Sequence, residues 1–170
     1  MKRLMDVKPR EAKEPLLGFW LAYLEDCRNR TKEVISNLKE EQLDEIFPQQ
    51  GNTIGTLLYH IALIEADWLY AEILHQGYPD FLQEWFPLEH RNEKGELSII
   101  KDWKLQQYVG LLDKVRYQFV QTLSEMTLED FHRLRSLPDY DVSPEWVCLH
   151  LLQHEASHRG QIQALMHFSP

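Results

Sequence analysis

Hydrophobic residues recur along the chain at the spacing of an amphipathic helix in four long stretches. In residues 15–37, apolar side chains follow one another at intervals of three and four. The same period continues in residues 53–75, 103–126 and 144–168. Each stretch has about 20 residues and would form a helix about 30 Å long, a length that suits a four-helix bundle. The sequence therefore predicts an all-α fold, with residues 1–170 as a single domain.

Short signals mark where these helices begin. Thr53 is a good N-cap for the second helix, and Ser143 followed by Pro144 is a strong start for the fourth. Thr127, followed three residues later by Asp130, predicts the cap of a further short helix. The joints between the long stretches are polar, so the four helices should be consecutive units of one bundle.

The longest segment without a helical pattern covers residues 77–100, between the second and third helices. It holds two glycines, two prolines and four aromatic residues. A long connection of this kind is typical of a functional lid or of a packed surface loop. Nowhere does the chain alternate convincingly with a period of two, so we expect no β-sheet.

Composition and charge argue against several classes of function and indicate a cellular compartment. The chain has 18 Lys and Arg against 27 Asp and Glu, a net charge of −9, which argues against a nucleic-acid partner or an anionic membrane surface. Its two cysteines lie far apart, as in proteins of a reducing compartment. No run of 18 apolar residues is present, and the basic N-terminus lacks the apolar segment of a secretory leader. We therefore expect a cytoplasmic protein.

Histidine placement is the most informative feature of the sequence. His150, His154 and His158 follow one another at intervals of four residues. Neighbours at this spacing lie about 40° apart around a helix and about 6 Å apart along it, so His154 and His158 can grip one metal ion. His60, in the middle of the second helix, is the best third ligand. His150 would lie beside the site or act as a fourth ligand.

Two other metal chemistries can be weighed from the same residues. Residues 154–158 match the HExxH motif of zinc peptidases, but only 12 residues follow His158 and leave no room for a downstream ligand. Glu155 and His158 also match the Glu-x-x-His pair of di-iron bundles, yet the chain offers no matched set of carboxylates on four helices. Taken alone, His60 could also be a hydrogen-bonded core residue.

Two segments resemble a known family. Residues 53–62, TIGTLLYHIA, resemble the second-helix signature of the DinB/YfiT-like superfamily, and residues 154–162, HEASHRGQI, resemble its fourth-helix signature. The resemblance implies an up-down-down-up bundle, often a homodimer. It also implies one divalent ion, Zn²⁺ or Ni²⁺, at the positions of His60, His154 and His158. Relatives of known activity include transferases and isomerases that use a low-molecular-weight thiol such as bacillithiol, mycothiol or glutathione.

Three neutral histidines leave a metal with an open coordination position, where a thiol or a water molecule can lose its proton. We therefore expect a transferase acting on a small thiol and an electrophile. The alternatives are a hydrolase, a ferritin-like oxidase with two metals, and a non-catalytic metal-binding or dimerisation bundle. The catalytic residues are not identified by the sequence; the candidates are Thr56, Asp67 and Glu155. Asp67 lies about 10 Å along the helix from His60, so it would face substrate rather than the metal.

Four further residues receive a structural interpretation. Cys27 and Cys148 are interpreted as small packed side chains. Within the fourth-helix motif, Gly160 is expected to allow close packing against a neighbouring helix. Arg159 is expected to pair with a carboxylate at the end of the bundle or to orient an anionic substrate.

Overall fold

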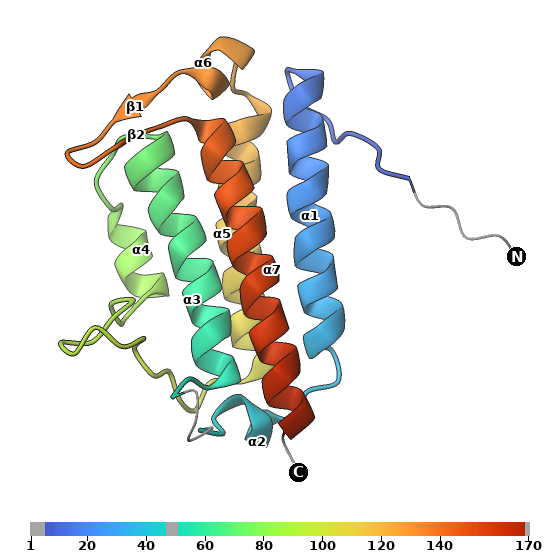
Figure 1. The fold of residues 1–170 in the computed structure, drawn as a ribbon, viewed down its shortest axis with the longest axis vertical. Helices are drawn as coiled ribbons and strands as arrows, with labels where there is room; N and C mark the ends of the chain where they lie inside the picture. Colours follow the sequence, from blue (N-terminus) through green and yellow to red (C-terminus); the bar gives the residue numbers. More distant parts are fainter. Residues whose placement is uncertain (1–5, 47–50, 169–170) are drawn as a thin grey trace, which may run out of the picture.

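A computed structural model describes residues 6–46 and 51–168, and four long helices dominate it (Figure 1). They are α1 (Pro15–Ile35), α3 (Ile54–Asp67), α5 (Leu105–Ser124) and α7 (Pro144–Phe168). Helices α1 and α7 run down the view of Figure 1, whereas α3 and α5 run up it. The two middle helices are therefore parallel, and the predicted all-α bundle with up-down-down-up connectivity is confirmed.

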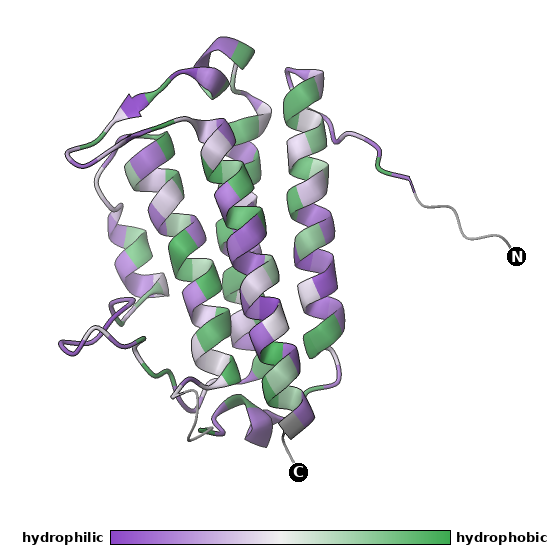
Figure 2. Ribbon diagram, viewed as in Figure 1, coloured by the Kyte–Doolittle hydropathy of each residue, from purple (hydrophilic) through white to green (hydrophobic). Residues whose placement is uncertain are grey.

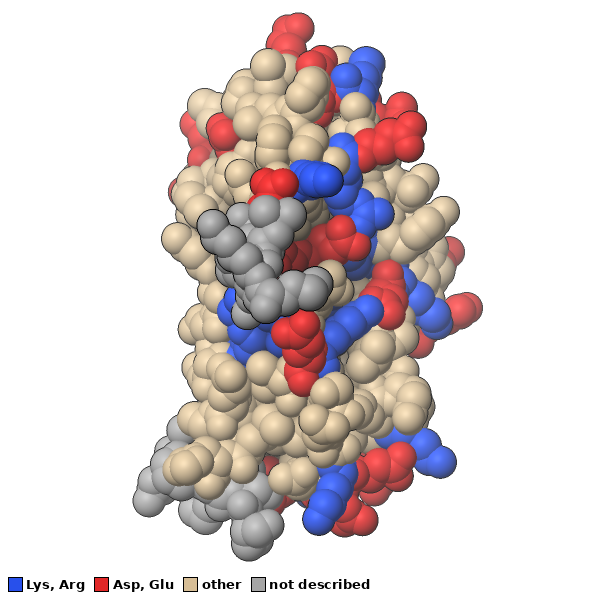
Figure 3. Space-filling view, turned by 90° about the vertical axis from the view of Figure 1, so that its right-hand side faces the viewer, with Lys and Arg blue, Asp and Glu red and all other residues tan. Residues whose placement is uncertain are grey.

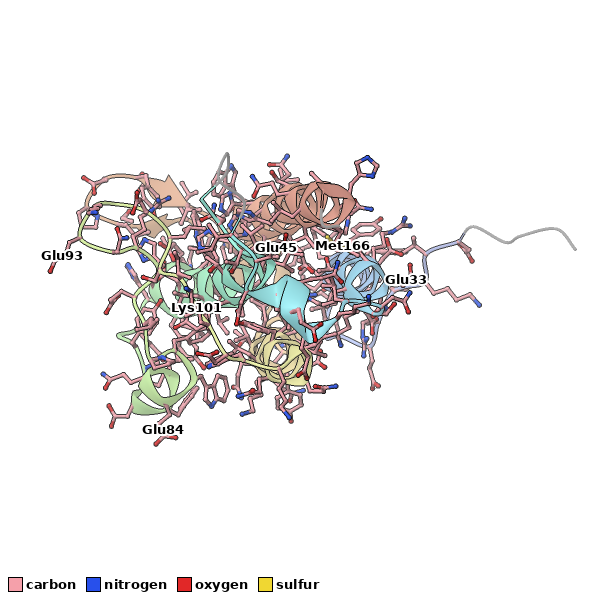
Figure 4. The ribbon with its side chains drawn as sticks, turned by 90° about the horizontal axis from the view of Figure 1, so that it is seen from below. Glu33, Glu45, Glu84, Glu93, Lys101 and Met166 are labelled. Carbon is pink, nitrogen blue, oxygen red and sulfur yellow. The ribbon has the colours of Figure 1, made fainter. Side chains whose placement is uncertain are left out.

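The order of the helices around the bundle differs from their order in the chain. Helix α1 packs against α7 and α5, and α3 packs against the same two helices from the opposite side. Figure 4 shows this arrangement along the bundle axis, with Glu84 and Glu93 on the outer side. Apolar and polar positions alternate around each long helix (Figure 2), because one stripe of every helix faces the shared core. Both cysteines are buried and unpaired, as expected.

The predicted caps are present. Thr53, Thr127 and Ser143 each accept a hydrogen bond from the backbone N–H three residues later, at 3.0, 3.2 and 3.2 Å. Thr127 caps α6 (Leu128–His132), the predicted short helix. Each cap satisfies one backbone donor that the first turn of a helix leaves free.

The connections contain regular structure that the pattern did not predict. Helix α4 (Asp80–Trp85) lies inside the segment 77–100, and α2 (Glu40–Leu43) follows α1. Strands β1 (Arg135–Ser136) and β2 (Asp141–Val142) pair antiparallel, so the expectation of no β-structure was wrong. Two residues per strand are too few to show a period of two, which is why the sequence does not predict them.

The second predicted helix changes its winding near its end. After Asp67 the α-helix continues as the π-helix η1 (Trp68–Ile73), and the N–H of Leu74 donates to the carbonyl of Leu69 at 2.9 Å. A π-helical turn is wider than an α-helical one and shifts the register of the side chains that follow it. This shift in register begins at Trp68, which lines the same cavity as His60, His154 and His158.

Four buried charged residues, one from each long helix, meet in the middle of the bundle; we call them the ion-pair cluster. They are Arg28 of α1, Glu65 of α3, Arg116 of α5 and Glu155 of α7. Arg28 bonds to Glu155 at 2.8 Å and to Glu65 at 2.5 Å. Arg116 bonds to Glu65 at 2.5 Å and to Glu155 at 3.2 Å. The cluster is neutral as a whole, and both guanidinium groups also donate to helix carbonyls, so no charge in it is left unpaired.

Close packing of α3 on α5 depends on Gly55, within the second-helix motif. A Cβ atom at this position would lie near the buried hydroxyl of Tyr108. In contrast, a Cβ at Gly160 would meet nothing within 4 Å, so the expected close-packing role of Gly160 was wrong.

We expect Gly55→Ala to destabilise the fold by about 1–3 kcal/mol, because the new methyl group must displace the Tyr108 ring or separate the two helices. Gly160→Ala is the matched control and should be neutral or stabilise by up to about 1 kcal/mol, since alanine is the better helix former at an exposed position. Urea unfolding of the two variants and the wild type measures both effects. Equal stabilities for the two variants would contradict the packing argument.

Candidate metal centre

Three histidines from two neighbouring helices converge on one point. His60 lies on α3, and His154 and His158 lie one turn apart on α7. The Nε2 atom of His154 is 3.2 Å from Nε2 of His60 and 3.1 Å from Nε2 of His158. Within residues 6–46 and 51–168, these three side chains form the group whose ligand atoms all lie within 4.8 Å of one another. We call them the histidine trio.

The distances between the three nitrogen atoms and their lone pairs suit a divalent metal ion. A tetrahedral site with metal–nitrogen bonds of 2.0–2.1 Å separates its nitrogens by about 3.3 Å, close to the distances found here. A neutral ring presents either one proton or one lone pair at Nε2, so His154 cannot form a good hydrogen bond to both neighbours. A cation, by contrast, can accept all three lone pairs. Imidazole ligands suit zinc and nickel among the common metals.

Burial keeps the trio unprotonated, as metal ligands must be. It lowers the pKa of His60 to about 4 and that of His154 to about 3, and the nearby imidazole of His158 adds to both shifts. Burial also lowers the pKa of His158. All three rings are therefore neutral at pH 7. The Glu155 carboxylate raises the pKa of His154, but burial and the neighbouring imidazoles outweigh it.

The orientation of His158 is held by a neighbour within the fourth-helix motif. Its Nδ1 atom lies 2.9 Å from Oε1 of Gln161, an oxygen that can only accept a hydrogen bond. Nδ1 of His158 therefore carries the proton, and its Nε2 presents a lone pair to the trio. Nδ1 of His60, in contrast, is buried with no hydrogen-bond partner among the described residues.

A cavity of about 850 Å³ opens over the trio. Helices α3 and α7 form one side of it, and the loop that follows α4 forms the other. Besides the trio, its lining residues are Gly51, Asn52, Ile64, Trp68, His90, Arg91, Glu96, Leu97, Ile99, His150 and Gln161. Its size is that of a small-molecule site, and a molecule inside it can reach the trio directly.

The three catalytic candidates do not line this cavity. Thr56 is buried, accepts a hydrogen bond from Thr53 at 2.9 Å and another from the N–H of Ile100 at 3.3 Å, and so holds the loop against α3. Asp67 lines an adjoining cavity of about 190 Å³, which shares Ile64 and His90 with the first, and accepts a hydrogen bond from the Tyr78 hydroxyl at 2.5 Å.

Glu155 points away from the trio into the ion-pair cluster. Burial raises the pKa of its carboxyl group, but the charges of Arg28 and Arg116 outweigh burial and hold the pKa below its usual value. The carboxylate is thus ionised, and its oxygens are bound to Arg28 and Arg116 in the bundle core. The arrangement is not that of a zinc peptidase or a di-iron bundle, in which this glutamate would face the metal or a substrate.

On α7, His150 lies beside the trio, which is one of its two expected positions, whereas Arg159 has a different partner from the one expected. His150 lines the cavity but its ring stacks on Trp146, 5.2 Å away between ring centres, and it is not part of the metal-capable group. Arg159 donates to the carbonyl of Cys27 at 3.0 Å and so ties α7 to α1. Arg159 thus has a structural contact, to a backbone carbonyl rather than the expected carboxylate.

Trp68, His90 and Arg91 are among the cavity-wall residues that the sequence does not single out. Trp68 lies in the second predicted helix, and His90 and Arg91 lie in the segment 77–100. A β-bridge between Arg91 and Leu97 turns this loop back over the cavity. The local sequence does not predict this loop conformation, because it depends on a surface formed by two helices that are distant along the chain. A long aromatic-rich connection was the one available signal.

Outside the cavity, charges of both signs are mixed. Figure 3 shows the face on the α1 side of the bundle, where acidic and basic side chains alternate in its described part. Pairs such as Arg30 with Asp26 and Lys32 with Asp113 account for this mixture. None of the helices in the described ranges is long and apolar enough to span a membrane.

Two solved structures resemble the chain in fold. A conserved protein from Enterococcus faecalis is 15% identical, with a TM-score of 0.65 over 86% of this chain and 92% of its own. YfiT from Bacillus subtilis, described as a probable metal-dependent hydrolase with an unusual four-helix bundle topology, is 17% identical, with a TM-score of 0.61 over 98% of this chain and 97% of its own. Among curated proteins, no significant match was found. The model of the DinB superfamily matches residues 23–162, most of the chain, and the chain therefore belongs to the DinB superfamily.

Proposed function

We propose that the chain is a divalent-metal-dependent enzyme that transfers a low-molecular-weight thiol to an electrophilic substrate, with the metal held by His60, His154 and His158. The observation that carries the proposal is the convergence of three unprotonated imidazole nitrogens on the wall of a cavity of about 850 Å³. Three protein ligands leave at least one coordination position for a substrate. A site with this opening, beside a cavity of this size, favours a catalytic role over a purely structural one.

The residues around the trio suit a thiol. When bound, a divalent ion is a Lewis acid that lowers the pKa of a thiol or of a water molecule. The thiol loses its proton to solvent, its sulfur forms a bond to the electrophilic carbon, and the electron pair of the broken bond leaves with the displaced group. Arg91 and His90 line the cavity, and the positive charge of Arg91 favours a nucleophile that is anionic when it reacts. Ile64 and Leu97 give the same cavity part of its apolar surface.

Hydrolysis is the second candidate, because YfiT is described as a probable metal-dependent hydrolase. A hydrolase of this kind usually has a general base within hydrogen-bond reach of the attacking water. Glu96, which is exposed, is the one carboxylate among the described residues that line the cavity, and His90 and His150 are its imidazoles outside the trio. A thiol is more acidic than water by several pKa units and depends less on such a base. This difference supports thiol transfer over hydrolysis.

The test is a thiol-transfer assay on the chain loaded with Zn²⁺ or Ni²⁺. Chlorodinitrobenzene serves as electrophile, with cysteine, glutathione and bacillithiol as thiols, and a nitrophenyl ester reports hydrolysis. We expect one of the thiols to be transferred faster than without protein, and His158→Ala to abolish the acceleration. His132→Ala is the matched control and should keep it, since His132 is exposed and paired with Glu145. Ester hydrolysis without thiol transfer would favour the hydrolase, and neither activity in a fully loaded chain would indicate a non-catalytic bundle.

A further inference from the structure

Four aromatic side chains form a continuous wall that starts at the trio; we call it the aromatic wall. Its members are His150, Trp68, Trp146 and Tyr140. Trp68 lies 4.4 Å from His150 and 6.4 Å from Tyr140 between ring centres, with interplanar angles of 33° and 25°. Trp146 is almost parallel to His150, at an angle of 6°. The rings thus present flat faces in roughly one orientation.

The wall is continuous with the metal centre. The ring of His150 lies 5.8 Å from the ring of His154, at an interplanar angle of 31°. Trp68 and His150 both line the cavity, and the side chains of Leu97 and Ile99 line it from the loop. A molecule bound to the trio would therefore have aromatic side chains beside it at Trp68 and His150, and apolar side chains on the loop side.

The outer part of the wall is too exposed to serve as core. Trp146 is 49% exposed and Tyr140 is 45% exposed, whereas the four largest fully buried side chains, all aromatic, lie inside the bundle. Trp146 and Tyr140 are not among the lining residues of the cavity, but they extend the wall outward from Trp68 and His150, which are. Exposed aromatic surface next to a cavity is typical of ligand-binding sites. Trp68 also begins η1, and π-helical turns recur at functional sites.

We propose that the cavity selects ligands with a planar aromatic ring, which stacks on Trp68 and His150 while its reactive group reaches the trio. This inference rests on the proposed metal-dependent function and narrows its substrate class. Aromatic rings attract one another beyond the area that they bury, through offset stacking of their faces. A saturated ring of the same size, carrying the same metal-binding group, lacks this attraction and cannot lie as flat between the wall and the loop.

The experiment compares two probes that differ in the ring alone. Benzohydroxamate and cyclohexanecarbohydroxamate carry the same metal-binding group, and Co²⁺ in the trio gives a visible spectrum that changes when either probe binds. We expect the wild type to bind benzohydroxamate roughly two- to tenfold more tightly than the saturated probe. The preference should fall to near one in Trp68→Leu. Trp146→Leu, a change at a half-exposed position, should reduce it less and guards against a folding defect in Trp68→Leu.

Trp85→Leu is the matched control, because Trp85 lies on α4 in a different groove and should leave the preference unchanged. Equal affinities for the two probes in the wild type, or an unchanged preference in Trp68→Leu, would overturn the aromatic selectivity while leaving the metal site intact. A chain that takes up no Co²⁺ would overturn the proposed function and this inference with it. The Co²⁺ spectrum therefore distinguishes a failure of the aromatic selectivity from a failure of the metal site itself.

Discussion

Arg28→Leu is expected to lower the free energy of unfolding by about 3–5 kcal/mol, because it leaves a negative charge of the ion-pair cluster uncompensated in the bundle core. Arg28 is 3% exposed and bonds to both Glu65 and Glu155. For a chain of this length the loss corresponds to a melting temperature lower by about 10 °C. Thermal and urea unfolding of the variant measure both quantities.

Arg30→Leu is the matched control on the same helix. Arg30 pairs with Asp26, but both side chains are more than half exposed, so the variant should unfold at nearly the same temperature and urea concentration as the wild type. The double variant Arg28→Leu with Glu155→Leu restores neutrality to the cluster and should cost less than the sum of its single changes. Strictly additive losses would contradict the description of the cluster as one network.

His154→Ala is expected to abolish metal binding, because Nε2 of His154 lies between the corresponding atoms of His60 and His158. The wild type should carry about one divalent ion per chain, as a site with three protein ligands does. Metal at a thousandfold excess over its dissociation constant should add about 4 kcal/mol of stability, and the variant should gain none. Mass spectrometry of tag-free protein and melting curves with and without Zn²⁺ or Ni²⁺ provide the measurement.

His150→Ala is the control for this prediction. His150 is one turn from His154 on the same helix and lines the same cavity, yet it lies outside the metal-capable group. The variant should therefore keep its metal. Loss of the metal from both variants would point to a fourth ligand and a closed, structural site. A wild type that binds neither zinc nor nickel after reconstitution would contradict the metal centre altogether.

The part of the site that lies on one helix could be predicted from the sequence. His154 and His158 are one turn apart, so the helical repeat alone brings them together. His60 could be predicted from its position halfway along a second helix, given a bundle in which the two helices are neighbours. The structure places its ring 5.0 Å from each of the other two rings, between centres.

Glu155 shows why the other candidates could not be assigned in the same way. It follows His154 directly, but one residue along a helix is a rotation of about 100°, which carries the carboxylate to a different face. Its partners, Arg28 and Arg116, come from α1 and α5, far away in the sequence. Residues that are adjacent in a sequence motif can therefore point to different sides of the helix and take part in different sites.

The sequence by itself determined the four long helices, the caps Thr53, Thr127 and Ser143, and the pair of histidines on α7, because these features follow from local periodicity and from backbone groups a few residues apart. The tertiary structure alone decided the ion-pair cluster, the aromatic wall and the loop over the cavity. Each of these depends on side chains from two to four segments that are distant along the chain. Their meeting is set by helix packing and long-range topology, which leave no periodic trace in the sequence.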